Sequence, residues 1–199
     1  LISVGSGTSS VGGMVQAHAG RSTVHTGGAV VVTSGEGTAT SSGVVLIRSS
    51  NSGEAGVSGS LLFSSGTSVT GNSGRVHMGT GAATAGRGGA VVVTVGSGTS
   101  GSGGLVQAHA GRSTVHTGGE VHVSSGEGTA TSSGAITIRS VNAGAAGTSG
   151  YLSFSSGSSV TGNSGYIHMG TGVATAGRGG MVLISVGSGT SSVGGMVQA

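Results

Sequence analysis

The stretch GAVVVTSGEGTATSS, residues 28–42, contains every feature that recurs along this 199-residue chain. A glycine opens the stretch, a short run of alternating apolar residues follows, and a second half rich in Gly, Ser and Thr completes fifteen residues. Alternation of this kind is typical of an extended strand, whose successive side chains point to opposite sides. The stretch therefore predicts one apolar strand, one turn and a second, more polar extended segment.

The same unit recurs along the whole chain. VQAHAGRSTVHTGG at residues 15–28 returns 91 residues later, and the first seventeen residues, LISVGSGTSSVGGMVQA, return at 183–199. Internal repeats decide the architecture, so we expect one continuous array over residues 1–199, a window of a longer tandem repeat. The glycines that open successive units are fifteen residues apart, with one step of sixteen: Gly13, Gly28, Gly43, Gly59, Gly74, Gly89, Gly104 and Gly119.

The step of sixteen places one extra residue in NSGEAGVSG at 51–59, and the segment NAGAAGTSG at 142–150 repeats it. A bulge or a wider turn can absorb a single extra residue without disturbing the units on either side. We expect the glycines at the turns to supply a positive φ or to leave space where a Cβ does not fit.

The composition excludes an ordinary globular domain. There are 47 glycines, two Phe, two Tyr and no Trp, and only 6% of the residues are charged. Such a chain resembles disordered linkers in composition, but its strict period and apolar alternation favour an ordered repeat. A net charge of +3 is too small to indicate a nucleic-acid partner. No apolar run is long enough to predict a membrane span.

These features predict an all-β fold, a flattened parallel β-solenoid (β-helix) with about fifteen residues per coil. A triangular coil, or two units sharing one turn of about thirty residues, remains open. In the run that follows the opening glycine, one set of alternate positions is apolar in successive units. We assign this set to the core: Val30, Val32, Val45, Ile47, Leu61, Phe63, Val76, Met78, Val91 and Val93.

The opposite side of the same strand is also apolar on several units. An exposed apolar stripe of this size marks an interaction surface, although β-branched residues also favour strands for their own sake. We expect a second copy of the chain, or another stretch of the same chain, to cover this lateral interface, which comprises Val31, Val44, Leu46, Leu62, Val92 and Leu105.

A threonine recurs at one position in the polar half of most units. If coils stack at the strand spacing, these residues form an outward ladder of hydroxyl groups, similar to the threonine arrays of insect antifreeze solenoids. The ladder indicates a surface that binds ice, mineral or polysaccharide, and O-linked glycans are further candidate partners. Its members are Thr8, Thr23, Thr38, Thr84, Thr99, Thr114, Thr129, Thr175 and Thr190.

The residue types needed for catalysis or metal binding are scarce. Four Glu are the only carboxylates, so no arrangement of nucleophile, base and orienting acid can be argued. The seven His occupy three different places in the unit and have no Cys or Asp beside them. We therefore expect no enzyme activity, no cofactor and no metal site.

The units SGEGTATSSGVVLIRS and GVSGSLLFSSGTSVTGNSG resemble those of Gly/Ser/Thr-rich tandem-repeat proteins of diatoms, other algae and protists. The resemblance covers essentially the whole chain and implies an extracellular or cell-surface structural role. It carries no functional residues with it. The leading hypothesis is a structural protein that forms a long filament by lateral and end-to-end association of its own copies, and a surface-binding module is the alternative.

Overall fold

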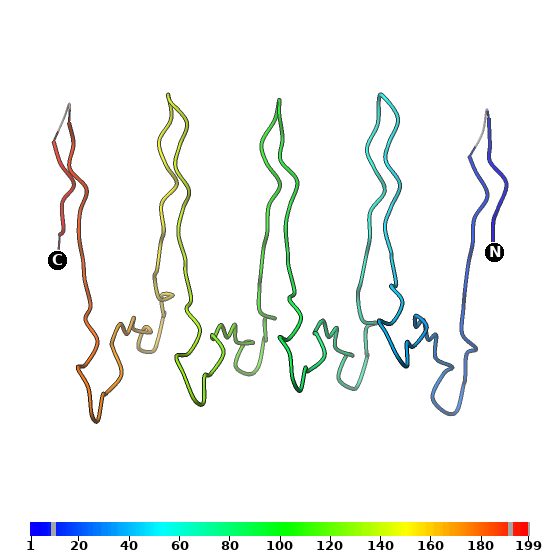
Figure 1. The fold of residues 1–199 in the computed structure, drawn as a ribbon, viewed down its shortest axis with the longest axis horizontal. Helices are drawn as coiled ribbons and strands as arrows, with labels where there is room; N and C mark the ends of the chain where they lie inside the picture. The colour runs from blue at the N-terminus through cyan, green and yellow to red at the C-terminus, as the bar shows by residue number, and fades with distance from the viewer. Residues whose placement is uncertain (9–10, 191–192, 199) are drawn as a thin grey trace. The chain divides into compact units, whose positions relative to one another are not determined.

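The computed structural model describes residues 1–8, 11–190 and 193–198, so parts of the two matching terminal segments lie outside it. These residues contain no α-helix and no β-strand. The backbone is extended and folds back on itself in narrow loops (Figure 1). The chain divides into two parts, Leu1–Gly104 and Leu105–Ala199, each of which contains the same two kinds of loop. The prediction of an all-β, flattened parallel β-solenoid is wrong for the part described.

The backbone hydrogen bonds close short loops, each between a glycine that opens one fifteen-residue unit and a glycine of the fifteen-residue unit before it. In the part Leu1–Gly104, the N–H of Gly28 donates to the carbonyl oxygen of Gly20 at 2.8 Å. In the second part, the N–H of Gly119 donates to the carbonyl oxygen of Gly111, also at 2.8 Å. The same bond, with donor and acceptor eight residues apart, joins Gly13 to Gly5, Gly43 to Gly35, Gly104 to Gly96, Gly134 to Gly126 and Gly195 to Gly187.

This spacing explains why the solenoid prediction failed. Stacked coils of fifteen residues require bonds between residues about fifteen apart, whereas the bonds that form lie eight apart. Closing the shorter loop costs less chain entropy, by about 0.6 kcal/mol for a halving of the length. The small side chains of this sequence offer little apolar contact between coils to offset that difference.

The glycine at the end of each loop, here called the closing glycine, has a side chain from nine residues earlier where its own Cβ would lie. A Cβ on Gly13 would be 3.1 Å from the Cβ of Val4, and one on Gly104 would be 3.2 Å from the Cβ of Val95. Distances this short are crowded, so a larger residue would force the neighbouring side chain to shift by a few tenths of an ångström. Of the described residues, only Gly56 has a positive φ, at +153°.

The extra residue of the sixteen-residue units is absorbed in the loop, as expected. The Cβ position of Gly59 lies 3.3 Å from the Cβ of Ser49, and that of Gly150 lies 3.4 Å from the Cβ of Ser140. In both loops the contact spans ten residues instead of nine. The extra residue lies between the two legs, the extended stretches of chain that lead into and out of the bend. Of the two expected forms, a bulge or a wider turn, the ten-residue span corresponds to a wider loop.

The loops fall into two kinds that alternate in groups of three. In one kind, the closing glycine forms the backbone bond described above. In the other kind, within the described residues, this backbone bond is not made, and a Ser or Thr always stands nine or ten residues before the closing glycine, as it also does before Gly43 and Gly134 of the first kind. Where this hydroxyl bonds, it donates to the carbonyl of the closing glycine: Thr80 to Gly89 at 3.3 Å, Ser156 to Gly165 at 3.0 Å and Thr171 to Gly180 at 3.4 Å. Three loops of each kind make one 91-residue repeat.

Candidate interaction surface

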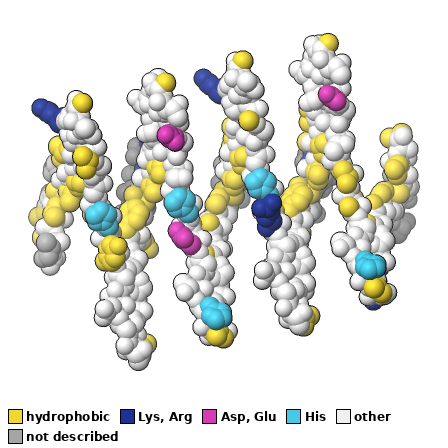
Figure 2. Space-filling view, turned by 90° about the horizontal axis from the view of Figure 1, so that it is seen from below, with side chains coloured by type: hydrophobic (Ala, Val, Ile, Leu, Met, Phe, Trp, Pro, Cys, Tyr) yellow, Lys and Arg dark blue, Asp and Glu magenta, His cyan; other side chains and the backbone are white. Residues whose placement is uncertain are grey.

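The described chain encloses no hydrophobic core. Its accessible surface is 19675 Å², and no apolar side chain in the described residues is buried. A compact protein of 18.3 kDa exposes about 8,100 Å² and an unfolded one about 27,000 Å². Figure 2 shows hydrophobic side chains lying open along the chain. Apolar surface is therefore available to a partner.

The alternation in the sequence survives as a difference in exposure between the two sides of each leg. The residues assigned to the core are 46–70% exposed, so the loops do not bury them. The residues assigned to the lateral interface are more exposed, at 73–85%. The least exposed of them, Leu105, is still more open than the most exposed residue of the core set, Val32. The side of the leg that the sequence assigns to an interface is the more accessible one.

This apolar stripe is strongest in the first 91 residues. The positions of Val31, Val44, Leu46 and Leu62 are occupied 91 residues later by His122, Ala135, Thr137 and Ser153. The contrast between the halves provides natural substitutions in otherwise similar units, and these are used below as a test of the interface.

The threonines of the predicted ladder lie at bends of the chain. Bends recur at residues 23–25, 38–40, 84–86, 99–101, 114–116, 129–131 and 175–177, and in each of these the threonine is the first residue. Thr8 and Thr190 also lie in bends, and all nine threonines are exposed. Because no strand is present in the described residues, the structure places these hydroxyls at loop ends and not on a sheet.

Serine hydroxyls hold several bends, a role that the sequence reasoning did not identify. The Oγ of Ser22 accepts the N–H of His25 at 2.9 Å, and the Oγ of Ser113 accepts that of His116 at the same distance. Ser68 and Ser159 accept the N–H groups of Gly71 and Gly162 at 3.0 Å. In each pair the serine is three residues before the donor, a recurring local pattern that could have been found in the sequence.

Within the described residues there is no cavity and no group of three His, Cys, Asp or Glu placed to hold a metal. No helix in this part of the chain is long and apolar enough to cross a membrane. The exposed apolar side of the loops is thus the feature most suited to an interaction. Comparisons with protein families, with curated proteins and with solved structures found no match to this chain.

Proposed function

We propose that this chain is a non-catalytic structural protein that associates with copies of itself into an extracellular filament. The observation that carries the proposal is the absence of any buried apolar side chain in the described residues, together with the exposed apolar stripe, which is strongest in the first 91 residues. The extracellular location rests on the resemblance to Gly/Ser/Thr-rich repeat proteins.

Energetics favour association over an isolated chain. Ordering the backbone costs about 1–2 kcal/mol per residue, and apolar burial, which contributes about 25 cal/mol per Å², is the main term that offsets it. A single copy leaves even the least exposed residue of its core set, Val45, 46% exposed. Contact with further copies is a source of burial, because the apolar side chains of the stripe and of the core set are open to them.

The repeat also favours open-ended growth. Two stripe positions stay apolar 91 residues later, since Val92 is matched by Leu183 and Leu105 by Met196, so a second copy can bind there with an offset of one repeat. The unmatched half of each copy then remains free for a third. Offset contacts of this kind do not close on themselves and produce filaments.

Self-association gives the direct test of this proposal. We expect the purified full chain to sediment as species whose mass increases with protein concentration, and to form filaments visible by electron microscopy. Retention of a monomeric mass at all concentrations, without filaments, would contradict the proposed function.

The nine exposed threonines at bends support a second candidate, binding to ice, mineral or polysaccharide. An ice-binding surface predicts thermal hysteresis at micromolar concentration, reduced when Thr114 and Thr129 are replaced by valine, as found at residues 69 and 160 in other units. Absence of hysteresis in a chain that forms filaments would remove the ice-binding candidate and leave the structural role.

A further inference from the structure

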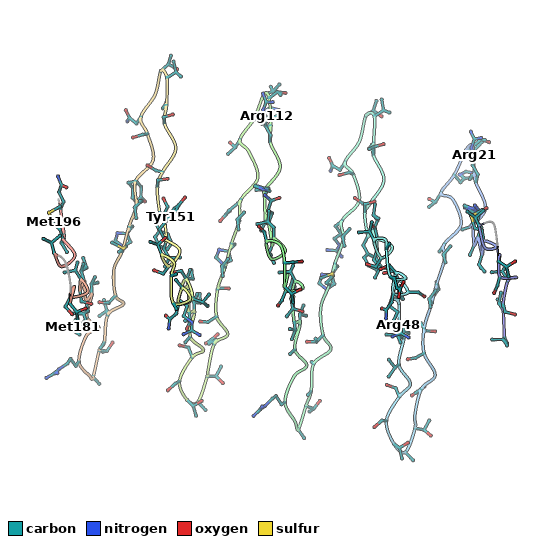
Figure 3. All side chains as sticks on the ribbon, turned by 90° about the horizontal axis from the view of Figure 1, so that it is seen from above. Arg21, Arg48, Arg112, Tyr151, Met181 and Met196 are labelled. Carbon is teal, nitrogen blue, oxygen red and sulfur yellow. The ribbon has the colours of Figure 1, made fainter. Side chains whose placement is uncertain are left out.

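The two tyrosines of the chain occupy equivalent places in successive units. Tyr151 directly follows the closing glycine Gly150, and Tyr166 directly follows Gly165. Their side chains are 89% and 88% exposed, more than the 66% of Phe63 and Phe154. Tyr151 is marked in Figure 3. Both phenol rings are therefore open to a reagent and to another chain.

The first half of the repeat shows that neither ring is needed to form its loop. Ser60 and Arg75 stand at the equivalent positions, 91 residues earlier. The close approach that ends the loop is nonetheless kept, since the Cβ positions of Gly74 and Gly165 each lie 3.3 Å from the Cβ of a serine nine residues before, although only Ser156 also donates to the carbonyl of its closing glycine. The tyrosines thus add a reactive group to loops that close without it.

We propose that Tyr151 and Tyr166 are sites of oxidative phenol coupling that join one copy of the chain covalently to the next. The inference rests on the proposed function, because self-association brings the neighbouring copy close. The sequence has no Cys and no Lys, so disulfides and lysine-derived cross-links are excluded. Tyrosine is the residue in this composition that couples readily by oxidation.

The reaction requires hydrogen peroxide and a haem peroxidase as the oxidant. The oxidant removes one electron and one proton from each of two phenols, and the peroxide is reduced to two waters. The two phenoxyl radicals form a carbon–carbon bond ortho to their oxygens, and each ring regains its aromaticity as the ortho hydrogen moves to the oxygen. The product is dityrosine, and the joined pair has lost two hydrogens.

Two coupling sites make the chain divalent, which gives a sharp test. The sedimentation of the full chain is recorded first, peroxidase and peroxide are then added, and covalent products are sized by mass spectrometry under denaturing conditions. We expect wild-type protein to give products larger than dimers, Tyr151→Phe and Tyr166→Phe each to stop at dimers, and the double variant to remain monomeric. Phenylalanine keeps the ring and removes only the phenol.

Several results would overturn the inference. These are growth beyond dimers in a single variant, loss of two hydrogens without any increase in size, or no coupling in wild-type protein while a tyrosine peptide in the same tube reacts. Absence of dityrosine from hydrolysates of the native material would also overturn it. An associated chain that does not couple contradicts this inference alone, whereas a chain that is monomeric before oxidation contradicts the proposed function.

Discussion

Replacing Leu46 with threonine and Leu62 with serine is expected to weaken self-association of the chain by about 100-fold or more. Each leucine is exposed in the single copy, and full burial of one stabilises a contact by about 1.5–3 kcal/mol, or about 10-fold to 150-fold in the dissociation constant. The new residues are those found 91 positions later, so the units should tolerate them. Sedimentation velocity over a range of concentrations measures the effect.

The repeat supplies both a reciprocal variant and a control. Thr137→Leu with Ser153→Leu extends the stripe into the second half and should strengthen association. Val69→Thr removes an apolar side chain that is 99% exposed at a bend, away from the stripe, and restores the residue common at that position. An equal loss of association in the Val69 variant, or none in the leucine variant, would exclude the stripe as the contact surface.

Gly37→Ala is expected to open the loop that ends at Gly43. A Cβ on Gly37 would collide with the backbone carbonyl of Ser41. It would also lie only 2.9 Å from the carbonyl oxygen of Thr40. Overpacking of this kind costs about 1–3 kcal/mol, while the closing hydrogen bond contributes only about 0.5–1.5 kcal/mol. The loop should therefore yield, and the amide of Gly43 should lose its bond to Gly35 and its protection from hydrogen exchange.

Two comparisons isolate the collision as the cause. Gly35→Ala changes a glycine of the same loop with no atom within 4 Å of the added Cβ, so the Gly43 amide should stay protected. In the Gly37 variant, the amide of Gly134, which bonds to Gly126 at 2.9 Å in the equivalent loop, should also be unaffected. Protection of Gly43 that survives Gly37→Ala would show that the loop does not close as described.

Much of the local order follows from the spacing of glycines and apolar residues. The glycines that open each unit in the sequence are the closing glycines of the structure, and the wider turn falls where the extra residue stands. Alternation also separates the more exposed side of each leg from the less exposed one, as Leu46 and Ile47 show at 74% and 58%. These properties depend on a few neighbouring residues, which is why a sequence pattern can predict them.

The pattern could not specify the hydrogen-bond partner of each leg. Alternation says that Val30 and Val32 share a side, and it is equally compatible with a leg that pairs with the next coil or with one that folds back on its own loop. The collision at Gly37 was also hidden, because it depends on how tightly the bend brings the carbonyl of Ser41 back towards it.

The sequence by itself determined the fifteen-residue unit, its grouping into 91 residues and the places of the closing glycines. It likewise determined that no cysteine chemistry is available. The tertiary structure alone decided that loops close over eight residues instead of stacking over fifteen, and that Val30, Phe63 and the other residues assigned to a core remain open. The physical reason is that pairing and burial depend on the free energies of competing closures, and closing the short loop costs the least chain entropy.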